Sequence, residues 1–156
     1  MAIVTFYRDA ENAPKPTMPA RLGANVVITC NGRILLERRR DCDIWGLVGG
    51  GVKKHETELQ AITREVYEEL GLRIAPKCFK KLAVYGDLGR VAAYQDGSIW
   101  RMVIVVFALE LETEPDFRIS SESKDLRFFS KEELKGVEIV VTHSDIVDDW
   151  FINGGG

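Results

Sequence analysis

The sequence predicts an α/β fold, in which helices flank a central mixed β-sheet. Residues 58–70 have the periodicity of an amphipathic helix. Residues 22–30 and 33–39 have strand character and are joined by Asn31-Gly32, a dipeptide typical of a two-residue hairpin turn. Residues 100–111 contain an almost continuous apolar run, which is typical of a central strand. This order of strands, helix and further strands favours helices packed on a sheet.

The chain as a whole has the composition of a globular protein. Its 156 residues, of which 46% are hydrophobic, predict a single domain over residues 1–156 with a sizeable core. The net charge of −3 gives no general attraction for nucleic acid, so a nucleic-acid partner is not expected. No run approaches the ~18 apolar residues of a membrane span, and the first residues do not resemble a signal peptide. The three cysteines lack CxxC spacing, so we expect free thiols and a cytoplasmic protein.

The segments on either side of the predicted helix are assigned from turn residues and apolar runs. Residues 1–20 are expected to form an edge strand at 3–7 and then a connector marked by prolines up to Pro19. After the helix, the pattern predicts strand-like runs over 73–85 broken at Pro76, a long loop or a hairpin over 86–97, a loop over 112–124 and a short strand over 125–129.

Two capping patterns predict the last helices. Ser130 and Glu133 have the spacing of a capping box, which predicts a short helix. Thr142 and Asp145 have a similar spacing and predict the start of a final helix. Residues 154–156, all glycine, are expected to form a frayed tail.

The helix at residues 58–70 has the most informative pattern in the chain. Thr57 and Gln60 form a capping box at its start, and Gly71 ends it. At 100° per residue, the apolar side chains form one narrow stripe, and Glu65, Glu68 and Glu69 form a second stripe beside it. Like charges three and four residues apart destabilise an isolated helix. Two interpretations remain open: a solvated acidic face, or a site for a hard divalent cation such as Mg²⁺.

The residues around this helix resemble the Nudix box. Its fixed positions are filled in order by Gly50, Glu56, Arg64-Glu65, Glu68-Glu69 and Gly71-Leu72. The resemblance extends upstream to residues 45–50, Trp-Gly-Leu-Val-Gly-Gly, although Val48 stands where the family often has proline. It implies a Nudix-type α/β/α sandwich with a central mixed β-sheet.

The resemblance also implies chemistry. Nudix hydrolases cleave the diphosphate bridge of a nucleoside diphosphate linked to another group, using water and Mg²⁺ or Mn²⁺. By this resemblance, Glu68 and Glu69 are the metal-binding pair and Glu65 binds metal or activates water. Arg64 positions that acid, and the carbonyl of Gly49 reaches the metal. The glutamate in the loop, Glu56, has a structural or secondary role.

Residues outside the box complete the predicted site. Glu122 and Asp125 lie in a late segment that in the family often contributes a further acid, and Glu122 is preferred as an additional metal ligand. Arg38 and Arg40 are candidates to contact phosphate, because the guanidinium fork matches phosphate oxygens. Aromatic candidates to stack on a nucleobase are Trp45, Tyr85, Tyr94 and Trp100. For all of these the alternative is an ordinary solvated or packing role.

The sequence therefore predicts metal-dependent hydrolysis of a nucleoside diphosphate derivative, with a nucleotide sugar such as ADP-ribose as the first candidate. A normal or oxidised nucleoside triphosphate is the enzymatic alternative, and a non-catalytic nucleotide-binding module is the alternative of another class. The expected partner is the small-molecule substrate, and a homodimer is compatible with the resemblance. The attached group, the number of metal ions and the general base are not specified by the sequence.

Overall fold

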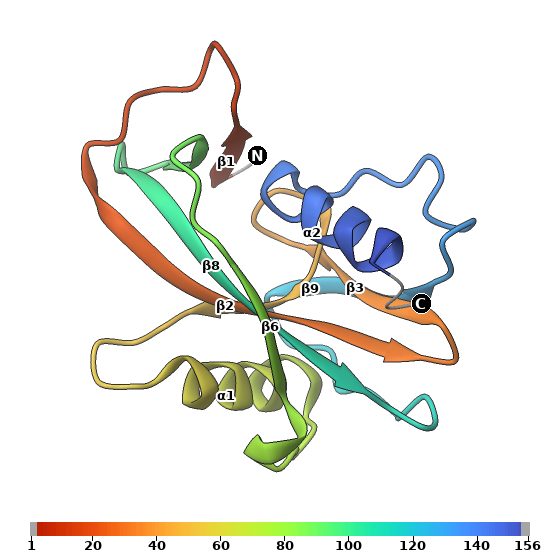
Figure 1. Ribbon diagram of the computed structural model, residues 1–156. Coiled ribbons are helices and arrows are strands. Elements are labelled where there is room, and N and C mark those ends of the chain that lie inside the picture. The colour runs from red at the N-terminus through yellow and green to blue at the C-terminus, as the bar shows by residue number, and fades with distance from the viewer. Residues whose placement is uncertain (1–2, 154–156) are drawn as a thin grey trace.

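A computed structural model, which describes residues 3–153, shows a mixed sheet with one helix on each side (Figure 1). The α/β prediction is therefore confirmed. In chain order the elements are β1 (Val4–Arg8), β2 (Met18–Cys30), β3 (Arg33–Arg39), β4 (Trp45–Gly46), β5 (Val48–Gly51), α1 (Glu58–Leu70), the 3₁₀ turn η1 (Pro76–Cys78), β6 (Lys80–Tyr85), β7 (Arg90–Tyr94), β8 (Ile99–Glu110), β9 (Ser123–Phe129) and α2 (Val141–Ile152).

The sheet is held together by its two longest strands, β2 and β8. They pair in parallel, and every other strand pair is antiparallel. The strand order is β1-β7-β8-β2-β3-β4, with β5 on β2, β6 on β8 and β9 on β3. Figure 1 shows β2 and β8 running side by side through the centre of the molecule. The apolar run at 100–111 is thus a central strand, and residues 3–7 correspond to the edge strand β1, as predicted.

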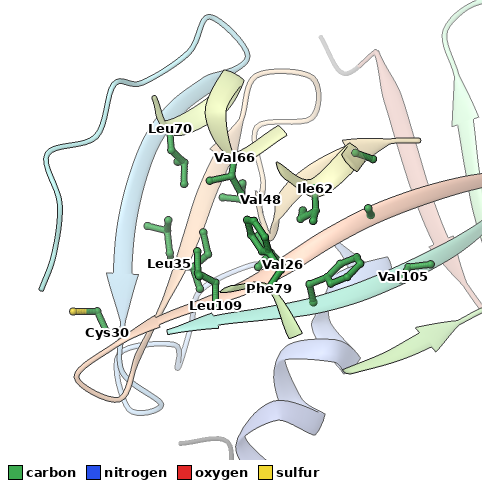
Figure 2. Close-up of a cluster of buried hydrophobic side chains, with 14 of the residues drawn as sticks. Val26, Cys30, Leu35, Val48, Ile62, Val66, Leu70, Phe79, Val105 and Leu109 are labelled. Atoms are coloured by element: carbon green, nitrogen blue, oxygen red, sulfur yellow. The ribbon is translucent and has the colours of Figure 1, made fainter. Parts of the chain in front are cut away.

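Alternation along the central strands separates two hydrophobic cores. Val26 and Ile28 of β2 contribute to one cluster, whereas Val27 contributes to the other. The first cluster lies under α1, where Ile62, Val66 and Leu70 are fully buried (Figure 2). The second lies under α2 and includes Ile146 and Val147. Since each buried side chain of this size contributes about 1.5–3 kcal/mol, both helices are fixed by their apolar faces.

The local signals around α1 and the first hairpin are confirmed. Thr57 and Gln60 form the reciprocal capping box, and Gly71 ends the helix in the left-handed conformation, with φ of 73°. Asn31 and Gly32 both have positive φ, 52° and 75°, as the predicted two-residue hairpin requires. Val48 lies in a regular strand opposite Val26 of β2, so proline is not needed there.

The start of β2 corrects the prediction. The strand begins at Met18 rather than at residue 22, so Pro19 lies within it and not in a connector. The pairing with β8 shifts register between Met18 and Arg21. Proline has no N–H to donate to a ladder, and a register shift is where a strand tolerates it.

At the C-terminal end the predicted final helix is present as α2, whereas the short helix after Ser130 and the capping role of Thr142 and Asp145 are wrong. Ser130 and Glu133 exchange both capping hydrogen bonds, of 2.9 and 3.1 Å, but residues 131–136 form only turns and no helix. Helix α2 begins after Val140, without a side-chain cap, and so Thr142 lies inside it. Asp145 does not cap the helix, because its carboxylate binds Arg90 and Arg8 instead.

The remaining predictions concern the loops and the termini. The segment 86–97 is a hairpin, because it contains β7 and turns directly into β8. The strand predicted at 125–129 is present but begins at Ser123. All three cysteines are free. None of the helices within residues 3–153 is long and apolar enough to cross a membrane. The predicted tail at 154–156 lies outside the described residues.

Candidate active site

A cavity of about 510 Å³ lies where the glycines of β5 meet Glu65 and Glu69 of α1. Its wall combines residues of β1, β2, β3, β5, β7, β8 and α1 with the loop before β9 and the first turn of α2. A volume of several hundred Å³ is typical of a site for a small organic molecule. The cavity therefore brings the Nudix-box helix together with residues that are distant in the sequence.

The glycines of β5 allow the backbone to pass close to the acids of α1. Gly49 has a φ of +147°, and a Cβ atom there would lie 2.1 Å from the carbonyl oxygen of Ala24. A Cβ atom on Gly50 would lie 2.5 Å from Oε1 of Glu65. No other residue fits at Gly49, because the clash there is with backbone. At Gly50 the clash is with the movable end of Glu65, so a larger residue would displace that carboxylate. At Gly51 the space is open enough for ordinary contact.

Three buried carboxyl groups gather at this wall. Glu65 and Glu69 of α1 are 8% and 4% exposed, and both line the cavity. Oε2 of Glu69 accepts a hydrogen bond of 3.4 Å from the N–H of Gly49. The third acid is Glu37 of β3, which is 4% exposed and close enough to Glu69 for its charge to raise the pKa of Glu69. Its Oε2 accepts a 2.7 Å hydrogen bond from Oγ of Ser123.

Glu37 was not predicted from the sequence. The signal was present, because an acid after the apolar residues 34–36 is unusual in a buried strand. Only the pairing of β3 with its neighbours places that acid beside α1, and strand pairing does not follow from local pattern. The Nudix resemblance did not cover residue 37 either.

Burial shifts the pKa values of the acids in this cluster. It raises the pKa of Glu69 well above the ordinary value, and the neighbouring charges of Glu37 and Glu65 raise it further. Burial also raises the pKa of Glu37. Several carboxylates that must share a dry site repel one another, and a bound cation relieves that repulsion. Of the two interpretations of the acidic stripe, a solvated face does not describe Glu65 and Glu69.

Arg64 and Glu68 lie at the solvent side of the cluster. Nη1 of Arg64 donates to Oε1 of Glu65 at 2.9 Å and to Oε2 of Glu68 at 3.1 Å. Nη2 also donates to the carbonyl oxygen of Gly51 at 3.1 Å, and the guanidinium forks onto Glu56. The side chain of Glu68 is half exposed. One arginine thus joins the box loop, the glycine strand and two of the acids.

The residues fit a divalent cation by their donor chemistry. Carboxylate oxygens, together with a close backbone carbonyl, are the ligands that Mg²⁺ and Mn²⁺ take in proteins. Within residues 3–153, however, no three His, Cys, Asp or Glu side chains are already arranged as a metal site. In their present contacts, Arg64 holds Glu65 and Glu68, while Glu69 bonds to Gly49, and each contact uses one oxygen of the carboxylate.

Three of the predicted residues outside the box also line the cavity, namely Arg40, Tyr94 and Glu122. The main chains of two of them are linked, since the N–H of Arg40 donates to the carbonyl of Glu122 at 3.1 Å. Trp100 lies beside the cavity rather than in its wall, with its ring 5.9 Å from the guanidinium of Arg21.

The other candidates lie elsewhere. Arg38 binds Asp43 at 3.0 Å, away from the cavity. Trp45 packs edge-to-face on Phe129, with ring centroids 5.1 Å apart, in the core under α2. Tyr85 donates a 2.7 Å hydrogen bond to Asp149 of α2, and Asp125 binds Arg127 at 2.8 Å. None of these four side chains lines the cavity.

Two cavity residues that the sequence did not single out are Arg21 and His143. The guanidinium of Arg21 lies 5.3 Å from the ring centroid of Tyr94 and forms no ion pair with any described residue. His143 lies in the first turn of α2 and is almost completely buried. Neither residue belongs to a motif, and both reach the cavity only through the fold.

Comparisons with known proteins agree with this architecture. A family model described as the NUDIX domain matches residues 19–150. In sequence, the chain is 30% identical over 96 residues to nucleoside triphosphatase NudI of Enterobacter sp. (strain 638), which covers 61% of this chain and 67% of that protein.

Solved structures show the same fold at low sequence identity. The NUDIX domain of Shewanella oneidensis NrtR, solved as a complex with ADP ribose, matches with a TM-score of 0.69 at 15% identity, covering 92% of this chain and 94% of that one. A bifunctional NMN adenylyltransferase/ADP ribose pyrophosphatase of Francisella tularensis, complexed with AMP and a Mn ion, matches with a TM-score of 0.68 at 21% identity. The match covers 88% of this chain but 43% of the Francisella chain.

Proposed function

The chain belongs to the Nudix family of pyrophosphohydrolases, and we propose that it hydrolyses the diphosphate bond of a nucleoside diphosphate linked to another group, with a nucleotide sugar such as ADP-ribose as the first candidate. The observation that carries the proposal is the cluster of buried carboxyl groups beside the glycines of β5, at the wall of a cavity large enough for a nucleotide. A cluster of carboxylates repels an anionic substrate unless a cation lies between them.

The box acids hold Mg²⁺ or Mn²⁺ in this proposal. Glu65, Glu68 and Glu69 would hold the cation, with the carbonyl of Gly49, and Glu122 would be a further ligand because it lines the cavity beside Glu65 and Glu69. When bound, a divalent cation neutralises phosphate charge and lowers the pKa of coordinated water. Arg64 orients Glu65 and Glu68 through the hydrogen bonds described above.

The chain's own groups supply the remaining steps. Glu65 accepts a proton from water, the water oxygen bonds to one phosphorus, and the bond from that phosphorus to the bridging oxygen breaks. Two phosphorylated products leave. Arg21 and Arg40 bind phosphate oxygens, because they line the cavity and a guanidinium pairs strongly with phosphate. Tyr94 and Trp100 flank Arg21 and offer aromatic faces to a nucleobase.

A nucleoside triphosphate is the second candidate substrate. It is favoured by the similarity to the Enterobacter nucleoside triphosphatase, whereas ADP-ribose is favoured by the ligand of the Shewanella domain. A binding module without catalysis is the alternative of another class. The box acids Glu65 and Glu69 line the cavity and Arg64 joins Glu68 to Glu65, which favours an enzyme over such a module. We further propose a cytoplasmic location, and a homodimer remains compatible with the family.

A hydrolysis screen tests the proposal. The protein is incubated with nucleotide sugars, nucleoside triphosphates, dinucleoside polyphosphates and a capped RNA, in Mg²⁺ or Mn²⁺ and in EDTA. Cleavage of one class, with metal only, is expected. Glu68→Gln combined with Glu69→Gln is expected to abolish it, whereas Glu58→Gln on the same helix, 3.4 Å from Lys81, is the matched control and keeps full activity. Unchanged turnover in the double variant would contradict the catalytic assignment, and binding without turnover in the wild type would favour the module.

A further inference from the structure

The imidazole of His143 is fixed in one tautomer by the main chain of the neighbouring β4–β5 segment. Its Nδ1 accepts a 3.1 Å hydrogen bond from the N–H of Leu47. A backbone N–H can only donate, so Nδ1 carries no proton and the ring proton lies on Nε2. Burial agrees with a neutral ring, because it lowers the pKa of His143 to about 3, with the positive charges of Arg39 and Arg90 as further causes.

The orientation of this ring is fixed as well. A Cβ atom on Gly46 would lie 3.0 Å from Nδ1 of His143, so the ring packs directly on the backbone at Gly46. Leu47 is held from its other side, since its carbonyl accepts a 3.2 Å hydrogen bond from Nδ2 of Asn25. Turning the imidazole over would leave the buried N–H of Leu47 without an acceptor, which is costly.

The opposite edge of the ring faces the cavity. His143 lines the cavity, and its Nε2 makes no hydrogen bond to any residue within 3–153. Since the Nδ1 edge packs on Gly46 and Leu47, the Nε2 edge is the one left to line the cavity. Beside it, the hydroxyl of Thr142 is buried and likewise has no partner in the described part of the chain. A donor fixed in this way is pre-organised for a ligand.

The charge around His143 differs from the charge around Arg21. Next to His143, the guanidinium of Arg39 is paired with Asp41, to which it donates two hydrogen bonds of 2.9 and 2.6 Å. Arg39 therefore offers no free positive charge to a ligand of His143. Arg21 has no acidic partner among the described residues, so its end attracts anions. Arg21 therefore suits the phosphates of a substrate, and His143 suits an uncharged group.

We propose that His143 contacts the substrate, and that its Nε2–H donates a hydrogen bond to an uncharged acceptor, such as a sugar hydroxyl or a base carbonyl oxygen, in one of the groups attached to the diphosphate. This inference rests on the proposed function and narrows it. It requires a substrate that extends from the phosphates to a polar, uncharged group, and it assigns no role to His143 in binding inorganic pyrophosphate.

Two variants test the roles of the two ring nitrogens separately. In His143→Asn, the side-chain oxygen occupies roughly the place of Nδ1, so the bond from Leu47 is kept and the Nε2 donor is lost. In His143→Gln, the side-chain amide reaches the place of Nε2 and the bond from Leu47 is lost. Each variant is measured for melting temperature, for KM and kcat with ADP-ribose, and for affinity for the non-hydrolysable α,β-methylene analogue of ADP-ribose and for inorganic pyrophosphate, both with Mg²⁺.

The asparagine variant is expected to keep the wild-type melting temperature and to bind the analogue about tenfold more weakly, the loss typical of one buried hydrogen bond. Its KM should rise by a similar factor, with pyrophosphate affinity unchanged. The glutamine variant should melt earlier and keep affinity for the analogue within about twofold of the wild type, because it retains a donor. Nitrogen-15 spectra of the free wild-type protein should show Nδ1 unprotonated.

The outcomes separate this inference from the proposed function. Unchanged analogue affinity in His143→Asn, equal losses for analogue and pyrophosphate, or a protonated Nδ1 would each overturn the inference alone. A wild type that binds the analogue but hydrolyses nothing in the panel would overturn the proposed function, and the paired variants would still decide the role of His143 by binding. A wild type that binds pyrophosphate but not the analogue overturns the inference for ADP-ribose-like substrates.

Discussion

Arg64 binds Glu56 through a fork of two hydrogen bonds, 3.0 Å from Nε to Oε2 and 2.6 Å from Nη2 to Oε1. Both side chains are largely shielded from water. The remaining donor of Arg64 is shared by Glu65 and Glu68. Glu56 therefore fixes the arginine that in turn orients two acids of the proposed metal site, which gives the glutamate of the box loop a physical role at a distance from the chemistry.

Replacing Glu56 by Gln should lower both stability and activity. The amide can accept only one of the two hydrogen bonds and carries no charge, so we expect a loss of about 1–3 kcal/mol in unfolding free energy. Hydrolysis should fall roughly tenfold, because a mobile Arg64 no longer fixes the two acids. Urea unfolding and steady-state kinetics measure both. Glu114→Gln, which removes an exposed acid 3.9 Å from Arg33, is the control and should change neither.

The same pair predicts a pH dependence of stability. The hydrogen bonds from Arg64 hold the pKa of Glu56 down, at about 2, below its ordinary value of 4.5. A depressed pKa in the folded state adds stability that is complete above pH ~4.5 and is lost as the pH falls towards ~2. Melting temperatures of the wild type and of Glu56→Gln should therefore converge over that window. A constant difference down to pH 2 would contradict the assignment.

The three glycines of β5 should respond differently to alanine. Gly49→Ala combines a positive φ with a Cβ atom 2.1 Å from the backbone at Ala24, so we expect it to destabilise the fold by several kcal/mol. Gly50→Ala should fold but displace Glu65, whose oxygen would lie 2.5 Å from the new Cβ, and so reduce turnover by more than tenfold. Gly51→Ala meets only Arg21 at 3.6 Å and should be tolerated. Melting temperature and kcat distinguish the three, and equal effects would refute this ranking.

What could be predicted from the sequence is what local chemistry determines. Thr57, Gln60 and Gly71 specify the ends of α1 by hydrogen bonds within a few residues, and the Asn31-Gly32 turn specifies its hairpin in the same way. Asp145 shows the limit. Its spacing from Thr142 suggested a cap, but Arg90 lies far away in the sequence, and tertiary pairing overrides the local preference.

The same distinction between local chemistry and tertiary pairing applies to the candidate site. The acids of the box were predictable because they lie on one helix at fixed spacing. Glu37, Arg21 and His143 were not, because they come from β3, β2 and α2 and meet only when the sheet is assembled. Trp45 shows the converse: an aromatic residue next to the glycine strand, it packs into the opposite core, since side chains alternate between the faces of a strand.

Arg21 should contribute to substrate affinity more than to turnover. Its guanidinium lies between the aromatic rings and Gly51, with no acidic partner among residues 3–153, and so it is available to phosphate. Arg21→Ala is expected to raise KM for a diphosphate substrate about tenfold, with a small change in kcat. Arg38→Ala removes an arginine that already binds Asp43 outside the cavity, and it should leave KM unchanged. Equal effects of the two variants would show that only the total charge matters.

Glu69→Gln should stabilise the metal-free protein while it abolishes activity. Burial, and then the charges of Glu37 and Glu65, raise the pKa of Glu69, so the folded protein loses stability as the pH rises from about 4.5 through that raised pKa. Glutamine is neutral and can still accept the hydrogen bond from Gly49, so it escapes this loss. In EDTA, the variant should melt higher than the wild type by roughly 2–4 °C, equivalent to about 1 kcal/mol, and the difference should grow with pH.

With Mg²⁺ added, the wild type should melt at a higher temperature than Glu69→Gln. A cation that binds the ionised cluster stabilises the wild type according to its affinity and stabilises the variant less, because one ligand has lost its charge. Thermal melts with increasing Mg²⁺, followed beside Glu58→Gln as the control from the same helix, measure this crossing. A variant that is less stable than the wild type in EDTA at every pH would mean that Glu69 stabilises the fold, and the cluster would then not be a site held ready for a cation.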